Sequence, residues 1–247
     1  MLKRLMKWSI SCVMSLLSAF TLADDVRVAV ASNFLTPMTQ LAQSFEQQTG
    51  HRVRISSGSS GRFYAQIQHG APFDVFLSAD ADKPRRLVNE GLALSRYHGT
   101  YAKGVLVLLA AKQADGLTPL QRLQQGRFSR LSLANPKLAP YGLAAEQALT
   151  AMNLASSTRS KWIQGENISQ AFQFVFSGNA NLGFVAGSQV MQASTFDVWV
   201  VPGDHYAPIL QDMVVLTGAA DNAAALALFR YVMSDAAQTQ IRALGYQ

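Results

Sequence analysis

Cysteine is almost absent from this chain, and its scarcity removes several kinds of chemistry. The single cysteine, Cys12, stands in an apolar stretch near the start. A lipoprotein cleavage site there would need a branched apolar residue upstream and a longer apolar segment, but Ser9-Ile10-Ser11 precedes it. Once Cys12 is assigned to a leader, disulfides, thiol catalysis and cysteine-based metal sites are all excluded for the rest of the chain.

Metal-binding and nucleophilic patterns are also scarce. The four histidines are scattered, and none stands in a metal spacing such as H-x-x-x-H. Gly58-Ser59-Ser60-Gly61 lacks the G-x-S-x-G spacing of a nucleophile elbow and the Gly-Lys-Ser/Thr end of a phosphate-binding loop. An enzyme that used Ser60 would need a nearby base, and His69 lies at the far end of the short helix predicted to follow. We therefore expect no enzyme, no cofactor and no metal held by side chains.

The first 23 residues have the three parts of a secretory signal peptide. Lys3, Arg4 and Lys7 form a positive start, and an uncharged apolar run covers residues 8–22. Thr21-Leu22-Ala23 then places small side chains at the positions that a signal peptidase reads. The apolar run is about 15 residues long, shorter than the roughly 20 that a membrane-spanning helix needs. We predict a cleavable signal peptide over residues 1–23 and a periplasmic mature protein; the alternative is an uncleaved membrane anchor.

Positive charge is weaker in the mature chain than in the precursor. The precursor has 21 Lys and Arg residues against 15 Asp and Glu residues, for a net charge of +6. Without the three basic residues of the leader, 18 remain against 15, which is a net charge of about +3. The densest basic run is only Lys83-Pro84-Arg85-Arg86, too short for a nucleic-acid footprint. We expect a soluble monomer without a nucleic-acid partner.

Apolar runs of strand length alternate with helical patterns along the chain, which predicts an α/β fold with parallel sheets. The predicted strands are residues 26–31, 53–55, 74–77, 105–110, 131–134, 182–185 and 213–216, with a crossing segment at 198–201. The predicted helices are residues 36–49, 62–69, 83–90, 120–125, 143–152, 169–177, 220–233 and 236–244.

The pattern starts afresh past Tyr101, yet no Pro/Gly-rich linker divides the two halves. We therefore predict two lobes joined by crossing strands, with the ligand in the cleft between them. Lobe 1 is predicted to hold residues 24–102 and 200–247, and lobe 2 residues 103–199. Hinges are expected near residues 101–103 and 199–201.

Small polar residues stand repeatedly between a strand and a helix. Ser32, Ser59 and Ser60 follow the first two predicted strands, and the Pro140-Tyr141-Gly142 turn and Glu166-Asn167-Ile168 precede helices in the second half. The first turn of a helix has free backbone N–H groups and a partial positive charge, so several such starts facing one cleft would bind an anion without lysine or arginine. The alternative is ordinary helix capping, which favours the same residue types.

Residues 70–80, Gly-Ala-Pro-Phe-Asp-Val-Phe-Leu-Ser-Ala-Asp, closely resemble a signature of the ModA family of periplasmic molybdate-binding proteins. Companion matches follow in the family's order over almost all of residues 24–247: residues 28–32, residues 58–61 with 65–67, residues 135–149, residues 166–168 and residues 182–185.

The resemblance implies a two-lobed type II periplasmic-binding-protein fold that delivers molybdate or tungstate, bound with high affinity, to the membrane permease of an ABC importer. It further implies that neutral donors bind the oxyanion. By motif position, Ser32 and Ser60 would donate from their hydroxyls and backbone N–H groups, and Asn33 from its N–H. Tyr141 and Ile168 would donate from the second lobe, Ile168 through its backbone N–H.

One departure from the family pattern concerns a tyrosine. Many members have a tyrosine in the segment where this chain has Val185-Ala186-Gly187, and an alanine where it has Tyr141. We hypothesise that the Tyr141 hydroxyl reaches the anion from the other loop and replaces the donor missing at Ala186.

The choice of ligand follows from protonation. A fully deprotonated dianion offers acceptors only, whereas monohydrogen phosphate carries a proton that needs an acceptor, and no mapped position is Asp or Glu. An unpaired buried polar group costs about 1–3 kcal/mol. Sulfate is also fully deprotonated, so only size can reject it; a binding protein of the same fold for sulfate or another oxyanion remains the alternative. A structural envelope protein would need no such hydroxyls.

Overall fold

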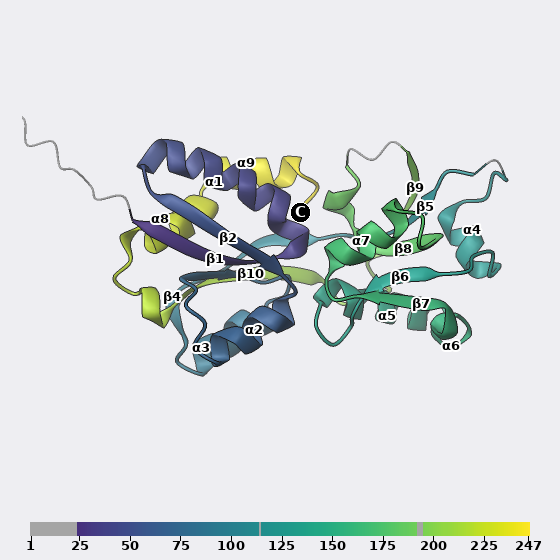
Figure 1. The fold of residues 1–247 in the computed structure, drawn as a ribbon, viewed down its shortest axis with the longest axis horizontal. Coiled ribbons are helices and arrows are strands. Elements are labelled where there is room, and N and C mark those ends of the chain that lie inside the picture. Colours follow the sequence, from purple (N-terminus) through teal and green to yellow (C-terminus); the bar gives the residue numbers. More distant parts are fainter. Residues whose placement is uncertain (1–23, 114, 192–194) are drawn as a thin grey trace, which may run out of the picture.

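The computed structural model describes residues 24–113, 115–191 and 195–247. They form two α/β lobes that lie side by side, and the chain passes between them at residues 104–106 and again at residues 200–209 (Figure 1). The predicted signal peptide, residues 1–23, lies outside the described residues. Within the described ranges, no helix is both long enough and apolar enough to cross a membrane.

The first lobe is built on a mixed sheet that has the strand order β2-β1-β3-β10-β4 in the described part of the chain. Strand β1 pairs in parallel with β2 and β3, whereas β10 pairs antiparallel with β3 and β4. The strands are β1 (Asp25–Ala31), β2 (Arg52–Gly58), β3 (Val75–Leu77), β4 (Ala93–Gly104) and β10 (Ile209–Leu216).

Helices cover both faces of this sheet because its strands carry apolar side chains on both sides. Val28 and Val30 of β1 pack into one core with the helices α1 (Leu35–Thr49), α8 (Ala223–Val232) and α9 (Asp235–Ala243). Ala29, between them, points to the opposite face, which α2 (Ser60–Gln68) and α3 (Asp82–Asn89) cover. Figure 1 shows these two helical layers above and below the strands.

The second lobe repeats the plan. In the described residues its sheet has the order β7-β6-β8-β5-β9, with β6 parallel to β7 and β8, and β5 antiparallel to β8 and β9. Its elements are β5 (Leu106–Ala111), α4 (Pro119–Gln124), β6 (Leu131–Ala134), α5 (Pro140–Ala151), α6 (Ala155–Thr158), β7 (Trp162–Gly165), α7 (Ile168–Phe176), β8 (Leu182–Ala186) and β9 (Phe196–Val200).

The expected two-lobed α/β fold is confirmed, but the expectation of parallel sheets was wrong in part. One strand in each described sheet runs against its neighbours, β10 in the first lobe and β5 in the second. The reason is connectivity, because β5 enters the second lobe directly after β4 and β10 returns from it. Each of these two strands starts at the cleft and runs away from it, whereas its neighbours in the sheet run toward the cleft and end there.

Several elements were missed or misplaced by the sequence patterns. β4 was not predicted because its first half is polar and only half-buried, and β7 was not predicted because it is short. Residues 56–58, which lie beyond the predicted strand of residues 53–55, extend β2, and α2 begins at Ser60 rather than Arg62. The crossing segment expected at residues 198–201 is mostly strand β9, which pairs with β5 inside the second lobe.

The two passages between the lobes have different lengths. β4 ends at Gly104 and β5 begins at Leu106, so a single residue separates the two sheets there. The return passage runs from Val200, the last residue of β9, to Ile209, the first of β10. The lobe boundaries after residues 102 and 199, and the hinges beside them, stay predictions.

Candidate functional site

Four helix starts converge on one small cavity between the lobes. The 3-10 turn η1 (Ser32–Phe34) and α2 come from the first lobe, and α5 and α7 come from the second. The cavity has an empty volume of about 180 Å³, whereas the pocket behind the crossing strands has about 510 Å³, so this cavity suits a small ion. Its lining residues are Ala31, Ser32, Asn33, Gly58, Ser59, Ser60, Ala79, Ala139, Pro140, Tyr141, Asn167 and Ile168.

The structure therefore brings all five sequence-predicted site residues together. Ser32, Asn33, Ser60, Tyr141 and Ile168 each line this cavity, although they come from segments far apart in the chain. Within the described ranges, the lining set contains no Lys, Arg, His, Asp or Glu. What the cavity offers is backbone N–H groups and hydroxyls at helix starts, where the helix dipole is positive.

Helix capping, the alternative explanation of these residues, fails at three of the four helix starts. The first-turn donors of η1, α2 and α5 have no side-chain cap from any described residue. Asn167 does cap α7 by accepting a hydrogen bond from the backbone N–H of Gln170 at 3.1 Å. Elsewhere, Thr118, Asn222 and Ser234 cap their helices in the usual way. The helix starts at the cavity thus keep donors that a ligand could use.

The two neighbouring serines at the start of α2 differ in their hydrogen bonds. The Ser60 hydroxyl oxygen accepts the backbone N–H of Ala79 at 2.9 Å, which leaves its own proton to donate. The Ser59 hydroxyl is buried and has no hydrogen-bond partner in the part of the chain that the structure describes. Because a buried polar atom normally has a partner, Ser59 joins the candidate ligand-binding residues.

Ser59 was named among the small polar residues at the predicted helix starts, but the family resemblance assigned the donor role in this segment to Ser60 alone. Ser59 stands at the N-cap position of α2, where serine is expected in any protein. The repeated serine in Gly58-Ser59-Ser60-Gly61 was the signal available, but a cap and a ligand donor look alike in sequence.

Asn33 and Ser32 contribute in different ways. The Asn33 side-chain amide donates to Gln211 Oε1 at 2.8 Å and to the Tyr246 hydroxyl at 3.1 Å, so it is committed to the interior. Asn33 can therefore serve the cavity through its backbone N–H. Ser32 connects the lobes, because its hydroxyl oxygen accepts the N–H of Ser169 at 3.4 Å and its carbonyl accepts the Ser169 hydroxyl at 3.1 Å.

Tyr141 and Ile168 lie in the first turns of α5 and α7. Backbone N–H groups at such positions have no partner within their own helix. The Tyr141 side chain is buried, and its hydroxyl oxygen accepts a hydrogen bond from Gln211 Nε2 at 3.2 Å. Burial raises the pKa of Tyr141 well above its ordinary value, so the phenol stays protonated and can act as a donor.

The motif of residues 70–80 supports the cavity from behind. Ala79 lines it and holds Ser60, as described above. Asp74 instead pins β3 to β1, because its carboxylate accepts the Arg27 guanidinium at 2.8 Å and the Arg27 backbone N–H at 2.7 Å. Asp74, the first of the two acidic residues of the motif, is therefore structural.

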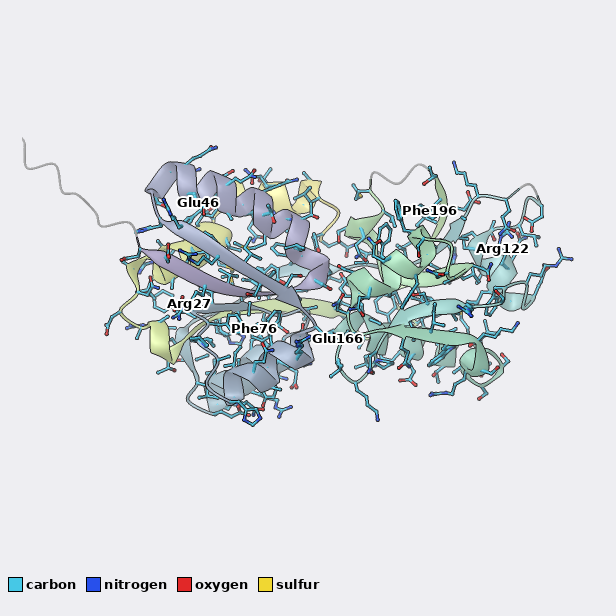
Figure 2. The ribbon with its side chains drawn as sticks, in the orientation of Figure 1. Arg27, Glu46, Phe76, Arg122, Glu166 and Phe196 are labelled. Carbon is cyan, nitrogen blue, oxygen red and sulfur yellow. The ribbon has the colours of Figure 1, made fainter. Side chains whose placement is uncertain are left out.

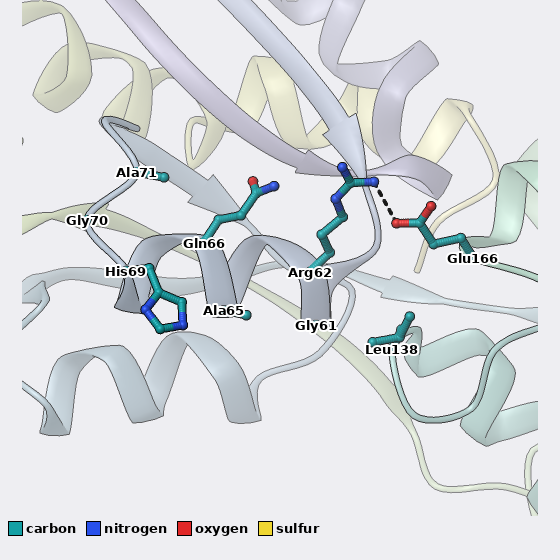
Figure 3. Close-up of a pocket in the computed structure, with 9 residues that line it drawn as sticks. All are labelled: Gly61, Arg62, Ala65, Gln66, His69, Gly70, Ala71, Leu138 and Glu166. Atoms are coloured by element: carbon teal, nitrogen blue, oxygen red, sulfur yellow. Dashed lines mark hydrogen bonds and ion pairs between the residues drawn. The ribbon is translucent and has the colours of Figure 1, made fainter.

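Contacts across the cleft show that the lobes are closed on one another. The backbone N–H of Gly61 donates to the carbonyl of Leu138 at 2.8 Å, and Arg62 forms an ion pair with Glu166 at 2.7 Å (Figure 3). Glu166 lies at the junction of the two lobes, beside α2 (Figure 2). Access to the anion cavity therefore requires these contacts to open.

A wider groove lies outside this closure, and His69 belongs to it rather than to the cavity. Its walls are α2 and the second-lobe residues Leu138 and Glu166 (Figure 3). A base within reach of Ser60, which an enzyme would need, is thus not supplied to the cavity by His69. In residues 24–113, 115–191 and 195–247, no three His, Cys, Asp or Glu side chains cluster as metal ligands would.

Comparison with known proteins places the chain among transport proteins. A family model described as bacterial extracellular solute-binding protein matches residues 26–247. The chain is 48% identical to the molybdate-binding protein ModA of Azotobacter vinelandii, covering 94% of this chain and 93% of the relative. It is 41% identical to ModA of Rhodobacter capsulatus, covering 91% and 88%. The solved periplasmic molybdate-binding protein of A. vinelandii matches with a TM-score of 0.85 at 39% identity, covering 90% of this chain and 98% of that one.

Proposed function

The chain belongs to the bacterial extracellular solute-binding proteins and, among them, to the ModA family, and we propose that it captures molybdate in the interlobe cavity. In this proposal the mature protein works as a monomer in the periplasm and hands the ion to the membrane permease of an ABC importer. Binding, rather than catalysis, is its whole task.

The observation that carries the proposal is the convergence of four helix starts, three of them without a side-chain cap, on a cavity without charged side chains. Helix N-termini are favourable places for anions, because their N–H groups point at the ligand and the helix dipole favours negative charge. Side-chain hydroxyls from Ser32, Ser59 and Ser60 add further donors at the same place. A site composed only of hydrogen-bond donors fits a fully deprotonated tetrahedral dianion, because each of its four oxygens is an acceptor.

Protonation supports molybdate over phosphate. Monohydrogen phosphate would place its proton against a donor, because none of the lining side chains is a carboxylate. An unpaired polar group costs about 1–3 kcal/mol, which corresponds to roughly 5- to 150-fold in affinity. We expect the affinity for molybdate to exceed the affinity for phosphate by a factor in this range or above it.

Tungstate and sulfate are separated from molybdate by size alone. Tungstate has nearly the same size and charge as molybdate, so we propose that it binds almost equally well. Sulfate is smaller, so hydrogen bonds from four helix starts could not all reach its oxygens. A sulfate-binding role remains the alternative, and the experiment below distinguishes it.

We assign the roles of the site residues as follows. From the first lobe, the Ser32, Ser59 and Ser60 hydroxyls and the backbone N–H groups of Asn33 and Ser60 donate to the anion. From the second lobe, the backbone N–H groups of Tyr141 and Ile168 donate. The Tyr141 hydroxyl supplies one further donor in place of the tyrosine that this chain lacks at Ala186, which is buried and does not line the cavity.

Ligand binding and lobe closure are coupled in this scheme, because donors from both lobes meet one ion. Hinge movement near residues 101–103 and 199–201 would open the cleft, and the bound anion would hold it closed. The closed form, with its matched surfaces from both lobes, is then the form offered to the permease.

The deciding experiment is isothermal titration of the mature protein with molybdate, tungstate, sulfate and phosphate at pH 8. The protein is first unfolded and refolded to remove any bound ion. We expect one-to-one binding of molybdate and tungstate with Kd between about 10⁻⁶ and 10⁻⁹ M, or −8 to −12 kcal/mol. Tight sulfate binding with weak molybdate binding would replace the proposal by its alternative, and silence from all four ions would refute an oxyanion site.

A further inference from the structure

A buried glutamine behind the cavity touches two of the proposed ligand-binding residues without lining the cavity itself. Gln211, on β10, is fully buried. It stands at an irregularity of the sheet, because the register between β10 and β4 shifts between Gln211 and Asp212. Such bulges redirect side chains and are common beside functional sites.

The hydrogen bonds of Gln211 link both lobes. Its Oε1 accepts the Asn33 side-chain amide at 2.8 Å and the Tyr101 hydroxyl at 3.1 Å. Its Nε2 donates to the Tyr141 hydroxyl at 3.2 Å. Asn33 belongs to the first lobe, and Tyr141 lies in the first turn of α5 in the second.

The backbone beneath this contact has no room for a side chain. A Cβ on Gly104 would lie 2.8 Å from Gln211 Nε2 and would overlap the Tyr141 hydroxyl. Gly104 is the last residue of β4, at the short passage between the lobes. The glycine thus lets the amide and the phenol meet over the crossing strand.

The polarity of these bonds determines where the Tyr141 proton can go. A glutamine amide nitrogen is a donor only, so the phenol oxygen beside it must accept. The proton of the phenol is then left for another partner, and the Tyr141 hydroxyl donates no hydrogen bond to a residue in the described part of the chain. Tyr141 lines the cavity, so an anion there is an available acceptor.

We infer that Gln211 is a positioning residue for specificity: by donating to the Tyr141 oxygen, it makes the cavity meet its ligand with an O–H donor rather than a lone pair. The inference rests on the proposed oxyanion-binding function. Such a cavity favours a fully deprotonated oxyanion and rejects a protonated one, and Gln211 contributes this preference without touching the ligand.

The test is a double-mutant cycle on molybdate affinity with Gln211→Met and Tyr141→Phe. Methionine keeps the size of glutamine but cannot donate. We expect each single change to weaken molybdate binding by about 5- to 150-fold, and the double variant to bind as Tyr141→Phe alone does. A merely structural role for Gln211 would lower affinity by the same factor in both backgrounds.

A matched control is available in Gln238, on α9. Its side-chain amide also donates to protein carbonyls, those of Tyr101 and Val232 at 3.1 and 3.0 Å, but it does not touch the cavity. Gln238→Met should leave the molybdate affinity within about twofold of the parent, because the Gln238 side chain contacts neither the cavity nor Tyr141.

A second variant, Gln211→Glu, tests whether the proton of the Tyr141 hydroxyl must point toward the cavity. A carboxylate accepts from Tyr141 and turns the phenol proton away from the cavity. Phosphate is used as a competitor against bound molybdate at pH 8. We expect its apparent affinity, relative to that of molybdate, to be about tenfold higher in Gln211→Glu than in the parent.

The outcomes separate this inference from the function on which it rests. If the parent binds no molybdate, the proposed function fails. If the parent binds molybdate but Tyr141→Phe binds it equally tightly, the function stands and the role of Gln211 is refuted, whether or not the Gln211 variants fold. Additive losses in the cycle, or an unchanged phosphate competition in Gln211→Glu, would also refute it.

Discussion

Two serines in equivalent helix positions show how much depends on a single hydrogen bond. Ser59 and Ser234 both stand at the N-cap of a helix. Ser234 caps α9 by accepting the N–H of Ala237 at 3.4 Å, whereas the Ser59 hydroxyl has no partner among the described residues. The first serine therefore stabilises its helix, and the second is better explained as a donor reserved for a ligand.

This difference leads to opposite predictions for the two alanine variants. Ser59→Ala should weaken molybdate binding by about 5- to 150-fold, without lowering the unfolding free energy of the ligand-free protein. Ser234→Ala should lower that free energy by about 1 kcal/mol and leave the affinity unchanged. Titration and urea unfolding of both variants measure the two effects; a loss of stability without a loss of affinity in Ser59→Ala would show that Ser59 is a cap after all.

Buried tyrosines make the fold sensitive to alkali. Burial raises the pKa of Tyr246 to about 12, and burial also raises the pKa of Tyr101 and Tyr141 well above the ordinary value. Between pH 10 and 12 the folded Tyr246 holds its proton while the unfolded chain loses it, so the unfolding free energy must fall as pH rises through this range.

For Tyr246 the expected loss over this range is about 3 kcal/mol, at about 1.4 kcal/mol per pKa unit. Urea unfolding at intervals from pH 9 to 12 measures it, and Tyr246→Phe should make the curve shallower. A free energy that stays level up to pH 12 in the parent would contradict the prediction.

Sequence could identify the site residues only through family resemblance. Spacing alone favoured capping for Ser32, Ser59 and Ser60, because the same residue types serve both purposes. The distinction lies in partners such as Ala79, whose N–H reaches Ser60 from the turn that follows β3. Local sequence does not show such tertiary hydrogen bonds. Gln211 was invisible for the same reason, since nothing around it in the chain differs from an ordinary strand.

At the scale of elements, the first turn of α2 has hydrogen-bond donors with two different tasks. One residue faces the anion cavity, and the next holds the two lobes together. Ser60 lines the cavity, while the N–H of the next residue, Gly61, donates across the cleft to Leu138. A Cβ on Gly61 would lie 2.9 Å from the Leu138 carbonyl oxygen and 3.1 Å from its Cα. The helix that serves the anion thus also makes the contact between the lobes, and only glycine permits it.

Gly61→Ala should therefore separate affinity from stability. Crowding of this kind costs about 1–3 kcal/mol, or about 5- to 150-fold in molybdate affinity, because it falls on the closed form. The open, ligand-free protein should not be destabilised, since alanine is the better helix former. Small-angle scattering with saturating molybdate should show a less compact variant.

Gly218→Ala is the control for this substitution, because a Cβ there meets nothing within 4 Å. It should bind and compact as the parent does. If Gly61→Ala closes and binds like the parent, the contact with Leu138 has no part in closure.

Elements with a clear apolar period were predicted well, and those without one were not. β1 and α1 follow alternating and helical patterns and were located to within about two residues, the usual uncertainty of such boundaries. β4 could not be found, because its sequence Ser-Arg-Tyr-His-Gly-Thr is polar and its strand character comes from pairing with β10. The antiparallel strands likewise depend on long-range connectivity.

At the scale of the whole molecule, one ion pair at the mouth of the cleft is expected to matter little. Arg62 and Glu166 are 57% and 37% exposed, so water and salt screen their attraction. Exposed pairs are worth about 0.2–1 kcal/mol, so Arg62→Ala should reduce molybdate affinity by no more than about fivefold.

Titration at low salt and at 1 M NaCl measures this effect, which should vanish at high salt. Exchanging the two charges, Arg62→Glu with Glu166→Arg, should restore the parent affinity. A loss much greater than fivefold that persists at 1 M NaCl would mean that Arg62 acts on the anion itself.

The order of the strands has a consequence for how the molecule folds. The strands of the second sheet all lie within residues 106–200, whereas β10, at residues 209–216, sits between β3 and β4 in the first. Until β10 arrives, the first sheet is two unjoined pieces, and joining them requires a long loop to close. Long-range pairings form late, so the second lobe, whose strands are contiguous in the chain, completes its sheet first. The first lobe, which holds both the first and the last described strands, is the last to become native.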